Sequence, residues 1–256
     1  RMQLNHRIYG SGQPIVIFHG LFGMLDNWQT LGKMLAEAGY MAVLADLRDH
    51  GRSPRTEAFD YHLLADDIYH FLDENWIYQS VIIGHSMGGK AAIQFVAEHE
   101  NMVSKLIVID IAPKKYPPGH HEVIDALLSV NLDTLTDRHQ AQSVLEEKLT
   151  EPGVVQFLLK NLTRTKDGHY TWKMNLPLLV RSYQNILDEV TSGHVIDTPA
   201  LFIRGENSDY VQDADLHIIG EMFSDYRLET IKGAGHWVHA DKPNELFEKI
   251  IHFIRQ

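Results

Sequence analysis

The chain has 256 residues, 44% of them hydrophobic, with a formal net charge of −11 and no cysteine. This length and apolar content suit one large globular domain, or one domain with an insertion. Interspersed acidic and basic residues argue against a nucleic-acid or anionic-membrane partner, and the lack of cysteine excludes disulfides and thiolate-ligated metals. We recognise no signal-peptide pattern and no run of ~18 apolar residues, so we expect a cytoplasmic location.

Six short runs rich in β-branched and apolar residues are typical of strands covered on both faces, as in a parallel sheet. They span residues 14–18, 41–45, 80–83, 106–109, 200–203 and 226–231. Helical spacing of apolar residues lies between or after them, at 28–38, 61–75, 90–99 and 244–254. This alternation predicts βαβ units, and therefore an α/β fold with a doubly wound, mostly parallel sheet.

Residues 113–195 interrupt this alternation. The segment opens with a proline- and glycine-rich stretch, then shows helical patterns but no convincing strand. A connection of this length exceeds a plain crossover between two strands. We interpret residues 113–195 as an inserted helical cap (the cap segment), which divides the sheet-containing core into residues 1–112 and 196–256. Caps cover sites and control the access of substrate.

A G-x-S-x-G pattern, Gly84-His85-Ser86-Met87-Gly88, joins the third expected strand to the helical segment that follows. The pentapeptide alone is weak evidence, but a strand before it and a helix after it are the context of a nucleophile on a sharp turn. Glycines at both ends remove side chains that would collide in so strained a turn. The pattern therefore predicts that Ser86 is a catalytic nucleophile.

A serine hydroxyl attacks well only when a base takes its proton. Of the 16 histidines, His236 stands out because it lies in a glycine-flanked loop, after the last expected strand and before the last helix. Hydrolases with a nucleophile on a strand–helix turn carry their base on such a late loop, so we expect His236 to be the general base. Its spacing to His239 matches no full metal-ligand pattern, and we expect neither a metal nor an organic cofactor.

Acyl transfer also needs two N–H donors that point at the developing oxyanion. One is expected from Met87, directly after the nucleophile, and the other from the loop after the first expected strand, which reads His19-Gly20-Leu21-Phe22-Gly23. In that loop the backbone amide of Leu21 is the candidate. An ordinary glycine turn is the alternative interpretation.

Five motifs in this order resemble those of the α/β-hydrolase family: VIFHGLFG, ADLRDHGRSPR, IIGHSMGGKAA, VIDIAP and GAGHWVHADKP. More narrowly, they are similar to the YbfF-type bacterial esterases and their abhydrolase-11-like eukaryotic relatives. The match extends through nearly the whole chain, including PGVVQFLLKN and WKMNLPLL in the cap segment. The resemblance implies an α/β-hydrolase fold and hydrolysis of short-to-medium acyl esters, with acyl-CoA thioesters as a further substrate class.

The acid that orients His236 is less obvious, because the chain departs from the commonest family pattern G-x-x-D-x-x-V. Between Gly205 and Val211 the acid position holds Ser208, and Asp209 comes one residue late. Asp110 ends an apolar strand at the edge where doubly wound folds gather their chemistry, and a buried acid there needs a partner. The VIDIAP segment resembles the acid-bearing segment of the YbfF-type esterases, so we favour Asp110, with Ser208 as an accessory group and Asp209 as the alternative acid.

These residues together predict a serine esterase that acts on a small acyl ester or thioester through an acyl-enzyme on Ser86. Two other functions stay open at this stage. A cofactor-free haloperoxidase or C–C bond hydrolase would use the same three residues, and a non-catalytic binding protein would share the fold. The oligomeric state is not predicted.

Overall fold

The centre of the computed structural model, which describes residues 2–256, is a seven-stranded sheet in the order β1-β3-β2-β4-β5-β8-β9. All neighbouring strands are parallel except the edge pair β1 and β3. The strands are β1 (His6–Tyr9), β2 (Pro14–Phe18), β3 (Met41–Ala45), β4 (Ser80–His85), β5 (Val103–Ile109), β8 (Ala200–Gly205) and β9 (Tyr226–Ile231). The predicted α/β class and all six expected strands are confirmed; β1, which is mostly exposed, was not predicted.

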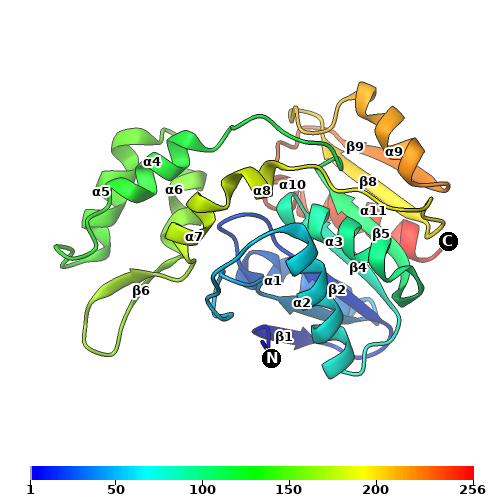
Figure 1. Cartoon of the computed structure of the whole chain (residues 1–256), viewed down its shortest axis with the longest axis horizontal. Coiled ribbons are helices and arrows are strands. Elements are labelled where there is room, and N and C mark those ends of the chain that lie inside the picture. The colour runs from blue at the N-terminus through cyan, green and yellow to red at the C-terminus, as the bar shows by residue number, and fades with distance from the viewer. Residues whose placement is uncertain (1) are drawn as a thin grey trace.

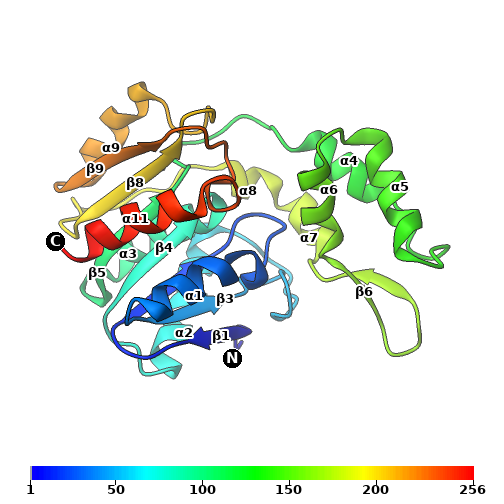
Figure 2. The ribbon, with the colours of Figure 1, turned by 180° about the vertical axis from the view of Figure 1, so that it is seen from behind.

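Helices cover both faces of this sheet (Figure 1). Successive side chains of a strand point to opposite faces, so the molecule has one apolar cluster on each face. In β2, Val16 and Phe18 pack in the cluster that holds α2 (Tyr61–Glu74), α3 (Met87–Glu98) and α9 (Leu216–Met222). Ile15 and Ile17 point the other way, toward α1 (Gln29–Glu37) and α11 (Pro243–Ile254), which Figure 2 shows from behind. Because successive strand residues face opposite sides, continuous apolar runs are needed for two such cores.

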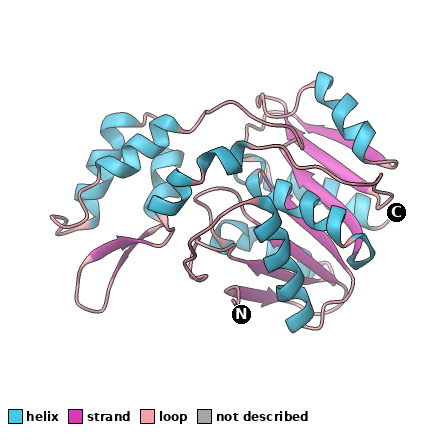
Figure 3. Cartoon of the chain, viewed as in Figure 1, coloured by secondary structure: helices cyan, strands magenta, loops and turns pink. Residues whose placement is uncertain are grey.

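The cap segment lies to one side of the sheet, between β5 and β8 in the chain (Figure 1). Its helices are α4 (His121–Ser129), α5 (Arg138–Lys148), α6 (Pro152–Leu159), α7 (Leu176–Arg181) and α8 (Tyr183–Leu187). It also holds the antiparallel pair β6 (Leu162–Arg164) and β7 (Tyr170–Trp172), visible as the small second sheet in Figure 3. The expectation of no strand here is therefore wrong.

The β6–β7 hairpin has a local cause in the sequence. Its turn contains Asp167-Gly168, and Gly168 has φ of 88°, a conformation that side chains disfavour and glycine adopts readily. The amide of Thr165 donates to the carbonyl oxygen of His169 at 2.7 Å across the turn. With only three residues in each strand, the alternation was too short to recognise.

The short helices are η1 (Leu25–Trp28), η2 (Glu100–Met102), η3 (Asp213–Asp215) and α10 (Val238–Asp241). No helix in residues 2–256 is both long enough and apolar enough to span a membrane. Parallel strands end at one edge of the sheet, so the loops after β2, β4, β5, β8 and β9 meet there. All the sequence-predicted site residues lie in these loops or directly at their ends.

Candidate active site

Ser86 occupies a sharp turn between the last residue of β4 and the first residue of α3. Its φ of 54° and ψ of −120° are strained for a residue with a side chain. A Cβ added at Gly84 would overlap the backbone of Gly88, and one added at Gly88 would overlap the carbonyl groups of Phe18 and His19. The two glycines of the motif are therefore required by close packing of β4, α3 and the end of β2.

His236 lies between Ser86 and Asp110. The hydroxyl of Ser86 donates to its Nε2 at 3.0 Å, and its Nδ1–H donates to Oδ2 of Asp110 at 2.7 Å. This arrangement fixes one tautomer, in which Nε2 is free to accept the serine proton. The His236 side chain is 24% exposed, whereas that of Asp110 is fully buried.

Asp110 accepts two further hydrogen bonds, which compensate for the burial of its carboxylate. The Ser208 hydroxyl donates to Oδ2 at 2.5 Å and the Gly205 amide to Oδ1 at 3.2 Å. Asp110 also has a positive φ, 56°, directly after β5. The structure thus brings Asp110 and Ser208 to His236.

Asp209, the alternative acid, is exposed to solvent. Within residues 2–256, no hydrogen bond or ion pair joins its carboxylate to His236. The neighbouring Ser208 points inward instead, in a turn closed by the hydrogen bond from its amide to the Gly205 carbonyl oxygen at 3.1 Å. A one-residue difference in this loop therefore decides which side chain reaches the histidine.

Leu21 and Met87, the two expected oxyanion donors, line the same cavity as Ser86. Met87 is the first residue of α3, so its amide has no acceptor within the helix and lies at the positive end of the helix dipole. Leu21 follows the turn at Gly20, where a Cβ would lie 3.3 Å from that of Ser86. The missing side chain at Gly20 lets this loop approach Ser86.

Two contacts of His236 were not anticipated. The ring of Tyr210 stacks on the imidazole, with centroids 3.8 Å apart and an interplanar angle of 20°, and Tyr116 donates to the Tyr210 carbonyl oxygen at 2.5 Å. The second contact is with His85, which donates from Nε2 to the His236 carbonyl oxygen at 2.8 Å. Burial holds the pKa of His85 well below its usual value, which favours the neutral ring. No motif in the sequence marks Tyr210, because its position depends on how the loop after β8 folds.

Two cavities meet at Ser86, and they share Leu21, Tyr210 and the Gly119–His120 pair. The first has a volume of about 420 Å³; we call it the lysine chamber, because Lys90, Lys114 and Tyr116 line it. The second has a volume of about 550 Å³; we call it the tryptophan chamber, because Trp28, Phe157 and Trp237 line it. His236 lines the tryptophan chamber only.

Residues 13–243 match the family model described as the alpha/beta hydrolase fold. The chain belongs to the α/β-hydrolase family. This α/β-hydrolase is 38% identical to the esterase YbfF of Escherichia coli (strain K12) over 95% of its own chain and 94% of that protein. It is 34% identical to the sn-1-specific diacylglycerol lipase ABHD11 of Xenopus laevis, over 99% of this chain and 84% of that one.

Among solved structures, a marine microorganism esterase resembles this α/β-hydrolase with a TM-score of 0.96 and 39% sequence identity. The likeness covers 99% of this chain and 100% of the other. The resemblance to YbfF-type esterases, predicted from five sequence motifs, is therefore confirmed.

Proposed function

We propose that this α/β-hydrolase is a serine esterase in which Ser86 is the nucleophile, His236 the general base and Asp110 the acid behind it. Its class, carboxylic ester hydrolase, is supported by the esterases and the lipase to which the chain is similar. The observation that carries the residue assignment is the continuous Ser86–His236–Asp110 hydrogen-bond chain, with distances of 3.0 and 2.7 Å.

In the proposed reaction, Oγ of Ser86 attacks the ester carbonyl carbon while Nε2 of His236 takes the hydroxyl proton. The amides of Leu21 and Met87 donate to the oxyanion that forms. The imidazolium then protonates the leaving alkoxide, and Asp110 stabilises its positive charge meanwhile. A water molecule, activated by the same histidine, hydrolyses the acyl-enzyme and restores Ser86.

Short-to-medium acyl esters are the proposed substrates, because the two chambers that meet at Ser86 have volumes of about 420 and 550 Å³, which suit small-molecule substituents. Acyl-CoA thioesters are a second proposed class, since His236 can protonate a thiolate as well as an alkoxide.

The division into a core, residues 1–112 and 196–256, and a cap segment, residues 113–195, is part of the proposal. Val154, Phe157 and Leu158 of α6 line the tryptophan chamber, which supports a role of the cap segment in substrate access. A cytoplasmic location stays a prediction from the sequence.

The test replaces the proposed nucleophile. We expect Ser86→Ala to lower kcat for 4-nitrophenyl butyrate by about 10⁶-fold and to abolish labelling by a fluorophosphonate probe. Ser129→Ala, on the exposed face of α4, is the matched control and should retain both. Hydrolysis that survives Ser86→Ala within tenfold would overturn the assignment, and a wild-type protein that neither reacts with the probe nor hydrolyses esters would favour the binding-protein alternative.

A further inference from the structure

Lys90 is an unusual wall residue of the lysine chamber. It follows Ser86 by four residues on α3, so it lies one helical turn from the nucleophile. It is only 1% exposed, and its Nζ donates to the carbonyl oxygens of Asp188 at 2.7 Å and Leu187 at 3.3 Å. Within residues 2–256, no carboxylate lies at ion-pair distance from it. A buried ammonium without an anionic partner is costly.

A second lysine contacts the same aromatic ring as Lys90. The Nζ atoms of Lys90 and Lys114 lie 4.8 and 5.0 Å from the centroid of the Tyr116 ring. Lys114 is paired with Asp215 at 3.0 Å, whereas Lys90 has two carbonyl groups and the faces of Tyr116 and Tyr61. Carbonyl groups and rings carry no full charge, so they leave the charge of a protonated Lys90 without an anionic partner.

Burial lowers the pKa of Lys90 to about 7, against the opposite effect of Asp188 and Glu189. An anion in the chamber would stabilise the protonated amine and raise that pKa. Among residues 2–256, Asp209 is the one carboxylate that lines the chamber. It is exposed, so water screens its charge more than that of Lys90.

The geometry of the proposed reaction decides which part of the substrate meets these lysines. The leaving group must lie within proton-transfer distance of Nε2 of His236, which lines the tryptophan chamber only. The acyl group, attached to the same carbonyl carbon, must take the other direction from Ser86. That direction is the lysine chamber, which Leu21 and Met87 also line.

We propose that the lysine chamber binds an acyl group whose far end carries a carboxylate, and that Lys90 is the specificity-determining residue for it. The substrate class is then half-esters of short dicarboxylic acids, with the neutral alcohol portion in the tryptophan chamber. This inference rests on the proposed esterase function. The reaction is the same hydrolysis of the ester bond by water, and the distal carboxylate is unchanged by it.

The test compares esters that differ only at the far end of the acyl chain. Monomethyl glutarate and methyl pentanoate have equal chain length, and one ends in a carboxylate where the other ends in a methyl group. We expect the wild-type protein to prefer the half-ester in kcat/KM, as measured by methanol release at pH 6.5. We expect Lys90→Met to lower the ratio of the two kcat/KM values by about tenfold to a hundredfold, and the exposed Lys166→Met to leave it unchanged.

The ratio is measured within one preparation, so partial unfolding of Lys90→Met does not affect it. The succinate/butanoate and adipate/hexanoate pairs extend the comparison to other chain lengths. A wild-type protein that hydrolyses all three neutral esters at least as well as their half-esters would overturn the proposal while leaving the esterase function intact. An unchanged ratio in Lys90→Met would also overturn the proposal. Lys90 would then serve only to hold the carbonyl groups of Leu187 and Asp188 at the end of α8. Hydrolysis of neither ester would count against the esterase function itself.

Discussion

Ser86 and Asp110 share an uncommon backbone conformation. Both follow directly on neighbouring parallel strands, β4 and β5, and both have positive φ, 54° and 56°. Such residues cost roughly 1–3 kcal/mol each and persist only where their surroundings hold them. The Ser86 amide donates to the Ile109 carbonyl oxygen at 3.0 Å, and the Asp110 amide to that of Ile203 at 2.7 Å. The sheet itself therefore turns both side chains toward His236.

The two candidate acids can be separated by one pair of variants. We expect Asp110→Asn to lower kcat for 4-nitrophenyl butyrate by about 10³–10⁴-fold, because an amide in place of the carboxylate favours the wrong tautomer of His236. Asp209→Asn removes an exposed charge that lines the lysine chamber but does not contact His236, and with a neutral butyryl group it should change kcat less than about twofold. Steady-state kinetics of both purified variants, with circular dichroism as a folding control, provide the check. The reverse ranking would show that the loop after β8 carries the acid.

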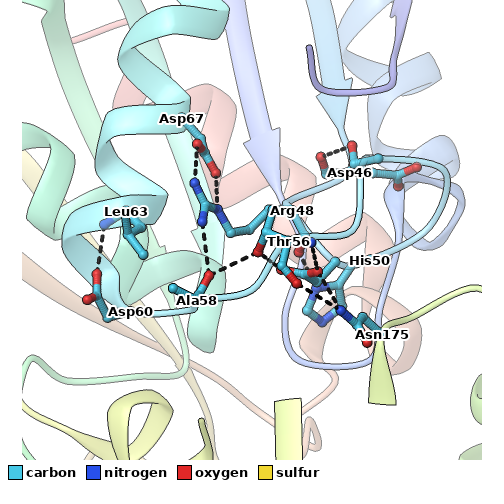
Figure 4. A network of polar contacts seen from close by, with 11 residues as sticks. Asp46, Arg48, His50, Thr56, Ala58, Asp60, Leu63, Asp67 and Asn175 are labelled. Carbon is cyan, nitrogen blue, oxygen red and sulfur yellow. Dashed lines mark hydrogen bonds and ion pairs between the residues drawn. The ribbon is translucent and has the colours of Figure 1, made fainter. Parts of the chain in front are cut away.

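At the scale of elements, the loop between β3 and α2 fastens the cap segment to the core (Figure 4). The Arg48 guanidinium donates to both carboxylate oxygens of Asp67, at 2.6 and 2.8 Å, which ties the loop to α2. Toward the cap segment, the side-chain Nδ2 of Asn175 donates to Oδ1 of Asp49 at 3.0 Å. The backbone amide of Asn175 donates to the Asp49 carbonyl oxygen at 2.8 Å. The same loop also reaches Trp172, whose carbonyl oxygen accepts from Arg55 at 2.6 Å.

Asn175→Ala should therefore loosen the cap segment locally without unfolding the core. Loss of its side-chain hydrogen bonds is expected to lower the local opening free energy by about 1–2 kcal/mol. That change corresponds to amide hydrogen exchange about fivefold to thirtyfold faster over residues 170–181. Hydrogen exchange monitored by mass spectrometry measures it, with Lys166→Ala in the exposed hairpin turn as the control. Equal protection in both variants would mean that apolar packing alone holds the cap segment.

At the scale of the whole molecule, three histidines are almost fully buried: His19, His50 and His85 are 1%, 0% and 4% exposed. Burial lowers the pKa of His19 from 6.5 to about 4, and burial together with the nearby His19 lowers that of His50 to about 3. The pKa of His85 is also well below its usual value, chiefly because of burial. Between these values and 6.5 the unfolded chain binds protons that the folded chain does not, so stability is lost as pH falls below 6.5.

We expect the free energy of unfolding to fall by at least about 4 kcal/mol between pH 7.5 and pH 5.5, since each of these three histidines contributes about 1.4 kcal/mol over this range. His120 and His239, whose pKa values burial lowers to about 4 and about 3, add to the fall. Urea unfolding followed by circular dichroism at several pH values gives the slope. His50→Leu, which removes one of the three groups, should lessen the fall by about one histidine's share. A wild-type free energy that is flat or rises on acidification contradicts this account.

Much of the fold could be predicted from the sequence because its signals are local. Continuous apolar runs such as residues 14–18 predict doubly covered strands whatever the rest of the chain does, and a strand followed by Gly84 to Gly88 predicts a sharp turn. The edge strand β1 was missed because it is short and mostly exposed, and the β6–β7 hairpin because its strands have only three residues each, so neither has a strong apolar pattern.

The sequence by itself determined the strand–turn–helix setting of Ser86 and the glycine-flanked loop of His236, since these depend on residues only a few positions apart. Only the tertiary structure decided which acid, 126 residues from the histidine, reaches its Nδ1, and that Ser208 rather than Asp209 points inward. It alone placed Tyr210 on the imidazole and Lys90 in the wall of a chamber that Ser86 also lines. The physical reason is that such contacts depend on the relative positions of strand ends and loops, which the packing of the whole sheet sets.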